Sequence, residues 1–324
     1  ILDAHLRLDP NARVAVEVFA TAGKIIVGGE ITSQAKVDCS RIVAGVINRI
    51  GYTRSEYQFD GNSCGVLSAI HEQSPDINQG VVRAAEEEQG AGDQGIMFGY
   101  ASNETNVLMP APIWLAHRLS ERLTKVRKDG LVDFFRPDGK TQVTIDLDTG
   151  LITDIVVSAC HKESATIEEV RKYIRHLLHG VAYPDRWHIN PAGVWTVGGP
   201  DADCGLTGRK IICDQYGGAY SVGGGAFSGK DVSKVDRTGT YMARQIAVEL
   251  CKKFKLRQCF VQMAFVIGRP DPISVSAKGS DGRNYAGYVR KTYDLTVKGM
   301  IEYLDLYQKD FEKLAEGCHF FDKR

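Results

Sequence analysis

The sequence predicts an α/β (α+β) protein of three structurally similar subdomains in a pseudo-threefold arrangement, with mixed sheets covered by helices. Three stretches alternate apolar and polar residues around a turn, and a helical pattern follows each of them. By length, a chain of 324 residues predicts about two domains, and 43% hydrophobic content is enough to build their cores. The three units are too far apart for a solenoid repeat. Chance repetition of a common order remains the alternative.

The first unit follows a short helical pattern at Ile1–Leu6, which has neither an initiator Met nor a capping residue. We therefore expect a segment upstream of it. Residues 13–19 and 24–31 alternate around Ala22-Gly23 and predict a hairpin. An apolar stripe from Val37 to Ile50 then predicts a helix, which Gly51 ends.

The second and third units repeat this order. Residues 142–147 and 151–158 flank a turn at residues 148–150, and a helix follows with the capping box Thr166…Glu169. Residues 258–267 and 273–277 flank a turn at residues 269–271 and lead into a tyrosine-rich stretch. The sequence thus predicts an N-terminal subdomain at 1–88, a central one at 89–196 and a C-terminal one at 197–324.

Composition restricts the partners. Forty basic residues balance forty acidic ones, so no overall field favours nucleic acid or a membrane surface, and small ligands are expected. The eight cysteines never approach C-x-x-C spacing, which indicates reduced thiols rather than a zinc or redox site. No apolar run approaches the ~18 residues of a membrane span, and no signal segment opens the chain. We expect a cytoplasmic protein.

The glycine-rich stretch Gly223–Asp231, followed by Lys234 and Asp236, organises the functional interpretation. Bare glycine backbone can close its N–H groups around an anion, and Lys230 and Lys234 supply positive charge. The stretch is not an ordinary P-loop, because Asp231 stands where a metal-binding Ser or Thr belongs and no strand leads directly into the glycines. The alternative is a glycine-rich turn with surface lysines.

Several other loops carry candidate residues, each with a structural alternative. Gly90–Gly95 holds Asp93 between glycines, as in either a ligand site or a tight turn. Arg136–Lys140 is predicted as a charged turn entering the second hairpin. Arg209 and Lys210 precede a predicted strand over residues 210–213 and add cations suited to polyphosphate or to a solvated face.

Two further stretches are less specific. The polar residues Gln73–Gly80, which include a proline, predict a surface loop that could serve as a lid. Trp195 follows an Asn-Pro-Ala-Gly turn and is either a core residue or a ring that stacks on a base.

The order of Gly90–Gly95, Leu206–Lys210 and Gly223–Asp231 resembles that of S-adenosylmethionine synthetases (methionine adenosyltransferases) from Ile1 to about residue 270. The resemblance implies that methionine sulfur attacks C5′ of ATP and releases tripolyphosphate, which the same site cleaves to pyrophosphate and phosphate. A neutral thioether has no proton to lose, so such chemistry needs alignment and charge neutralisation rather than a catalytic triad.

The resemblance also implies roles for individual residues. It assigns catalysis to Lys140, Arg209, Lys210, Lys230 and Asp93, the last from a neighbouring subunit. It assigns ATP contacts to Asp138, Gly139, Lys140, Trp195, Asp203, Arg209, Lys210, Ala226 and Lys230. It assigns methionine contacts to Glu30, Gln73, Asp203 and Lys234, magnesium binding to Asp236 and potassium binding to Glu17.

The implied cofactors are Mg²⁺ and K⁺, and the implied assembly is a homodimer with active sites at the interface, in which dimers pair into tetramers. Residues Gln73–Arg83 would form a gating loop. Trp195 stands where the family has Phe, and Ala315–Phe321 only loosely matches the family's carboxyl terminus and is assigned no role. The family's His-Pro-Asp-Lys motif would precede Ile1. This motivates one alternative, a non-catalytic ATP-binding subunit, and the P-loop-like spacing motivates another, an ATP hydrolase or kinase.

Overall fold

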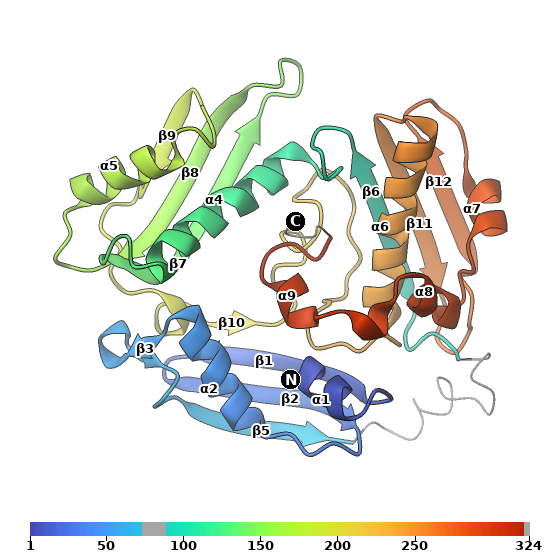
Figure 1. Ribbon diagram of the computed structural model, residues 1–324, viewed down its shortest axis with the longest axis horizontal. Helices are drawn as coiled ribbons and strands as arrows, with labels where there is room; N and C mark the ends of the chain where they lie inside the picture. Colours follow the sequence, from blue (N-terminus) through green and yellow to red (C-terminus); the bar gives the residue numbers. More distant parts are fainter. Residues whose placement is uncertain (73–88, 321–324) are drawn as a thin grey trace.

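Three sheets, each packed against helices, organise the chain in the computed structural model (Figure 1). The structure describes residues 1–72 and 89–320. The predicted α/β class with mixed sheets and three units is confirmed. The predicted limits at residues 88 and 196 stay predictions.

The N-terminal unit is a four-stranded sheet in the order β10-β1-β2-β5. Its elements are α1 (Leu2–Leu8), β1 (Arg13–Thr21), β2 (Lys24–Thr32), α2 (Cys39–Ile50), β5 (Gly65–His71) and β10 (Gly205–Leu206). The predicted hairpin and helix are confirmed. Asp38 caps α2 by accepting the Arg41 main-chain N–H at 3.0 Å, and Gly51 ends the helix with φ 120°. Helix α2 lies between β2 and β5 in the chain, and these strands are parallel.

The central unit repeats this order with the sheet β7-β8-β9. Its elements are α4 (Ala111–Lys128), β7 (Phe135–Ile145), β8 (Ile152–His161), α5 (Ile167–Leu178) and β9 (Arg186–Ile189). The capping box of Thr166 and Glu169 forms as predicted. Strand β8 runs antiparallel to β7 and parallel to β9, so the second hairpin and its crossover helix match the first.

The predicted turn at Arg136–Lys140 is wrong, because these residues lie within β7. The pairing register with β8 shifts between Phe135 and Gly139. A β-bulge accommodates Pro137, which cannot donate a ladder hydrogen bond, so the strand continues through residues that would otherwise favour a turn.

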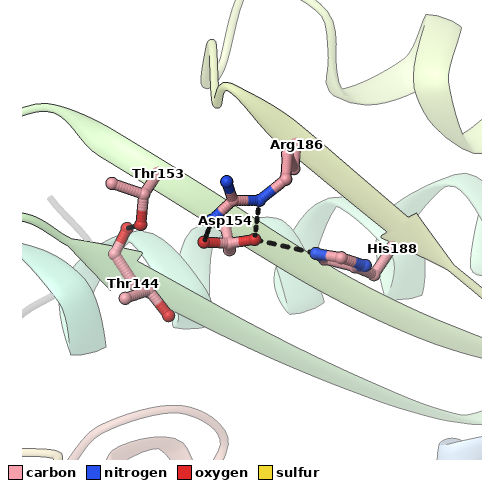
Figure 2. Close-up of polar contacts among 5 residues, drawn as sticks. All are labelled: Thr144, Thr153, Asp154, Arg186 and His188. Carbon is pink, nitrogen blue, oxygen red and sulfur yellow. Dashed lines mark hydrogen bonds and ion pairs between the residues drawn. The ribbon is translucent and has the colours of Figure 1, made fainter.

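The face of this sheet opposite its buried residues carries a polar cluster (Figure 2). Asp154 on β8 accepts hydrogen bonds from Arg186 Nε and Nη2 at 2.8 and 2.7 Å, and His188 Nε2 lies 2.8 Å from the same carboxylate. These contacts, with Arg186 foremost, hold the pKa of the Asp154 carboxyl well below its usual range. The neighbouring Ile155 and Val157 point the other way, into the core.

The third unit is the antiparallel sheet β12-β11-β6, packed against the longest helix. Its elements are β6 (Gly95–Ser102), α6 (Val235–Phe254), β11 (Gln258–Phe265), β12 (Ser274–Gly279), α7 (Ala286–Thr292), α8 (Val297–Tyr303) and α9 (Phe311–Ala315). The predicted third hairpin is confirmed as β11 and β12. Strand β6, from a distant part of the chain, joins it beside β11 (Figure 1). Helix α6 packs so closely that a Cβ on Gly99 would lie 2.0 Å from the Ala243 carbonyl oxygen.

Short elements complete the described chain. They are β3 (Thr53–Arg54), η1 (Ser55–Tyr57), β4 (Phe59–Asp60), η3 (Gly199–Asp201) and η4 (Leu306–Gln308). The predicted strand over residues 210–213 is wrong, because residues 207–218 form successive turns. Gly208, Gly217 and Gly218 all have positive φ there, and Ile212 is 52% exposed, so the run has no face to bury.

The three units share two main cores. One continuous cluster of buried residues joins the N-terminal sheet to α6 and the third sheet, whereas the central unit has a core of its own. Among the described residues, no helix is both long enough and apolar enough to cross a membrane.

Candidate active site

The glycine-rich stretch forms a loop that is hydrogen-bonded to β1 on one side and leads into α6 on the other. The Val16 N–H donates to the Gly229 carbonyl oxygen at 3.1 Å, and the Asp231 N–H donates to the Val14 carbonyl oxygen at 2.9 Å. The fully buried Asp231 carboxylate accepts the Val14 N–H at 2.7 Å and the Ser233 N–H at 2.8 Å. Asp231 therefore anchors the loop to the sheet, which explains why an acid replaces the hydroxyl residue of a P-loop.

Two positions of this loop require glycine, because neighbouring atoms lie too close to the backbone there to leave room for a Cβ. Gly229 has φ +84°, and a Cβ there would lie 1.8 Å from the Val16 carbonyl oxygen. A Cβ on Gly225 would lie 2.2 Å from Cγ of Asp236. The Asp236 carboxylate therefore lies directly against bare backbone of the loop.

A pocket opens where this loop meets the outer face of β1 and β2. Its cavity of about 420 Å³ is lined by four predicted site residues, Glu17, Glu30, Ala226 and Lys230, together with Ser228. Lys230 Nζ donates to Asp236 Oδ2 at 2.5 Å, and the two side chains are 23% and 13% exposed. The pocket thus combines one cation with two carboxylates, Glu17 and Glu30, and that cation is paired with a third, Asp236.

Lys234 and the predicted loop Gly90–Gly95 also lie together. Lys234 is only 8% exposed, and a Cβ on Gly92 would lie 3.2 Å from its Cδ. Asp93 is exposed, and its carboxylate accepts the Gln94 main-chain N–H at 2.7 Å. The aliphatic part of the Lys234 side chain therefore packs against the glycine backbone of this loop. The Asp93 carboxylate on the same loop remains accessible to solvent.

A second group of predicted residues gathers at the β7 bulge. Asp138 Oδ2 accepts the Gly199 N–H at 2.7 Å, and Lys140 Nζ lies 5.7 Å from the centre of the half-buried Trp195 ring. The cation of Lys140 thus faces an aromatic surface. Burial and the nearby Asp138 raise the pKa of the Cys160 thiol to about 12, so this thiol stays protonated and is no nucleophile at neutral pH.

The segment from Gly199 to Lys210 links the two groups. Gly199 bonds to Asp138 at one end, while at the other end β10 pairs with β1 and a Cβ on Gly208 would lie 3.3 Å from that of Ala226. Asp203, Arg209 and Lys210 lie on this segment, and all three side chains are exposed. The structure therefore brings Arg209 and Lys210 near the glycine loop through the backbone but leaves their charged ends facing solvent.

Other features correct or extend the sequence-based site. Gln73 and all of the expected gating loop, Gln73–Arg83, lie outside the described residues. The anchoring role of Asp231 and the burial of Arg237 and His319 were missed; the only available signals were the P-loop mismatch at Asp231 and the loosely matching carboxyl terminus. Within residues 1–72 and 89–320, no three His, Cys, Asp or Glu side chains form a metal cluster. The single carboxylate of Asp236, paired with Lys230 beside the glycine loop, fits a divalent ion shared with a bound anion rather than one held by protein ligands alone.

These observations define the class: an α/β protein of three sheet-and-helix units with a glycine-rich loop beside paired Lys and Asp side chains. The sequence was also compared with protein-family descriptions. S-adenosylmethionine synthetase matches with its N-terminal domain at residues 1–75, its central domain at residues 88–195 and its C-terminal domain at residues 197–324. The chain belongs to the S-adenosylmethionine synthetase family. Membership brings methionine adenosyltransferase activity, ATP and methionine as substrates, and the use of divalent metal ions.

Proposed function

We propose that this protein makes S-adenosylmethionine by attack of the methionine sulfur on ribose C5′ of ATP. The whole triphosphate leaves and is then hydrolysed at the same site to pyrophosphate and phosphate. One observation carries the proposal: the glycine loop is fixed on β1, with Lys230 and Asp236 at its surface and a pocket beside them. Bare backbone and a cation at one place suit a leaving polyphosphate.

The proposed ATP contacts divide by charge. Lys230, Lys140, Arg209 and Lys210 neutralise the departing triphosphate as catalytic groups, which is supported by their location on the loop, the bulge and the connecting segment. The exposed ends of Arg209 and Lys210 are free to close on the anion when ATP binds. The remaining proposed ATP contacts are Asp138, Gly139, Trp195, Asp203 and Ala226.

The proposed methionine contacts are Glu30, Asp203, Lys234 and Gln73. Glu30 lines the pocket beside the glycine loop, and a carboxylate there suits both an amino group and the positive sulfonium that forms during transfer. Lys234 has the charge to pair with a carboxylate. Asp93 acts from the neighbouring subunit in this proposal, which suits its exposure.

Magnesium and potassium are the proposed ions. Asp236, which pairs with the pocket residue Lys230, would hold Mg²⁺ together with phosphate oxygens, and Glu17, which lines that pocket, would hold K⁺. Bound Mg²⁺ supplies charge neutralisation on the triphosphate. The chain's own part is to keep the Asp236 carboxylate against Gly225, ready to accept the ion in place of Lys230.

The proposed assembly is a homodimer, with dimers that pair into tetramers, located in the cytoplasm. Its support is the outer face of the N-terminal sheet, where Leu67 and Leu206 are 58% and 41% exposed. Apolar side chains on an open sheet face suit burial against a second copy. Analytical ultracentrifugation tests this assembly.

Product analysis tests the proposed function. Purified protein incubated with ATP, methionine, Mg²⁺ and K⁺ should yield S-adenosylmethionine, pyrophosphate and phosphate in equal amounts. Omission of methionine should abolish the sulfonium product, which is the matched control. Formation of ADP would instead indicate a hydrolase or kinase. Calorimetric ATP binding without turnover, rescued by an active homologue, would indicate a non-catalytic subunit.

A further inference from the structure

A buried arginine lies directly behind the glycine loop. Arg237, in the first turn of α6, is 1% exposed, and its Nε donates to the Phe227 carbonyl oxygen at 3.0 Å. Its Nη2 donates to the same oxygen. Among the described residues no carboxylate lies within ion-pair distance of Arg237, and the charges of Asp3 and Asp231 act on it only from farther away. Burial of a charge without a direct ion pair is costly, so the Phe227 carbonyl oxygen, which accepts two of its N–H groups, is a major partner of this guanidinium.

Aromatic rings fix the direction of this guanidinium. It lies 4.4 Å from the centre of the Phe311 ring and 5.7 Å from that of Tyr241. Nη1 donates to the Tyr241 hydroxyl oxygen at 3.3 Å. The planar fork is thereby held on two sides, and its other donors can aim at Phe227.

The carboxyl-terminal stretch, to which the sequence assigned no role, extends this chain of contacts. The Tyr241 hydroxyl lies 2.8 Å from His319 Nδ1, and burial together with the Arg237 charge lowers the pKa of His319 to about 3. His319 is therefore neutral, and the tautomer protonated at Nε2 lets Nδ1 accept the Tyr241 hydroxyl proton while the Tyr241 oxygen accepts from Arg237. The Phe227 ring packs edge-on against His319 and Phe320, with centres 4.9 and 5.9 Å apart.

The hydrogen bonds from Arg237 to the Phe227 carbonyl oxygen also fix the orientation of the Ser228 N–H, which belongs to the same peptide group. Because the peptide is planar and trans, the Ser228 N–H points away from the side on which Arg237 grips the carbonyl. Ser228 lines the pocket beside Lys230. Rotation of this peptide plane would turn the N–H away and present an oxygen to an anion instead.

We propose that Arg237 is a positioning residue that, with Tyr241 and His319, locks the Phe227–Ser228 peptide so that the glycine loop presents N–H groups to the triphosphate. This inference rests on the proposed function and adds a group that touches neither substrate nor metal. It also gives the carboxyl-terminal residues His319 and Phe320 a part in shaping the loop.

A matched pair of variants tests the inference. Arg244, also on α6, is 4% exposed and donates to the main-chain oxygens of Tyr100, Leu108 and Val107 at 2.6, 2.9 and 2.9 Å. Arg237→Lys and Arg244→Lys thus each remove a buried guanidinium from the same helix. Only Arg237, however, donates hydrogen bonds to the glycine loop. Both should lower the melting temperature.

The decisive readouts are the Kd of tripolyphosphate with Mg²⁺, by calorimetry, and amide hydrogen exchange over residues 223–231 in the free full-length protein. Arg237→Lys should weaken tripolyphosphate binding about tenfold or more and speed exchange in the loop. Arg244→Lys should leave both within about twofold of wild type. Tyr241→Phe, which keeps the ring, should shift both readouts in the same direction as Arg237→Lys but less.

Three outcomes would overturn the inference: unchanged Kd and exchange in Arg237→Lys, equal effects of the Arg244→Lys control, or a Kd change without any change in loop exchange. Wild-type protein that neither binds tripolyphosphate nor forms S-adenosylmethionine would instead overturn the proposed function. Loop exchange in the two arginine variants would then still decide whether Arg237 holds the Phe227–Ser228 peptide.

Discussion

Replacement of Asp231 by Ala should destabilise the protein strongly, although the residue contacts no substrate in the proposed mechanism. The carboxylate is fully buried and accepts the N–H groups of Val14 and Ser233 at 2.7 and 2.8 Å. A buried donor without an acceptor costs about 1–3 kcal/mol, so two such donors cost about 2–6 kcal/mol, and we take ~4 kcal/mol. Because 1 kcal/mol lowers Tm by about 2–4 °C for domains of 150–250 residues, the expected fall is about 8–16 °C.

Scanning calorimetry of the purified variants measures this fall. Asp231→Asn keeps one acceptor oxygen and should lie between Ala and wild type. Asp93→Ala, at an exposed acid near the same site, should change Tm by about 1 °C or less and serves as the control. A fall below about 3 °C in Asp231→Ala would refute the claim that this carboxylate anchors the glycine loop to β1.

Three further predictions concern the site and the central sheet. Lys230→Met should lower kcat about 10²–10³-fold in an S-adenosylmethionine formation assay, because one charge-assisted contact to a developing anion is lost; near-normal turnover would remove Lys230 from the mechanism. Gly225→Ala should impair Mg²⁺-dependent turnover, whereas Gly224→Ala, whose Cβ meets nothing within 4 Å, should not; equal turnover would contradict the close approach. Asp154→Asn should be less stable than wild type at pH 7, and the gap in Tm should narrow progressively as the pH falls below about 4, because a depressed folded-state pKa contributes its full stability above the unfolded value and loses it as the pH falls toward the folded value. A gap as large at pH 2 as at pH 7 would show that ionisation of Asp154 is not its source.

Local sequence signals predicted the local structure of this chain well. The three hairpins, the end of α2 at Gly51 and the Thr166–Glu169 capping box all depend on residues within a few positions of one another. The turn predicted at Arg136–Lys140 failed because the neighbouring strand β8 supplies pairing that overrides the preferences of Pro137 and Gly139. A prediction from a few consecutive residues cannot include such contacts with a neighbouring strand.

Prediction of the site from the sequence was limited in the same way, because it found local patterns but not contacts between distant residues. Glycine and lysine spacing identified the loop with Lys230, and the pocket brings Glu17 and Glu30 to it. The roles of Asp231 and Arg237 depend on partners that no spacing rule connects, since Asp231 bonds to Val14 more than two hundred residues away. A buried acid or arginine in sequence looks the same as an exposed one until its partner is located.

The pairing of β6 with β11 has a consequence for biosynthesis. Ser102 lies opposite Gln258, and Gly95 lies opposite Phe265. A ribosome adds about 5–20 residues per second, so after β6 is made it waits on the order of 10–30 s before its partner strand exists. During that interval its apolar residues and open main-chain edge have no native partner and are open to mispairing with other nascent chains. We expect the third sheet to close late, after the central unit has already folded on its own core.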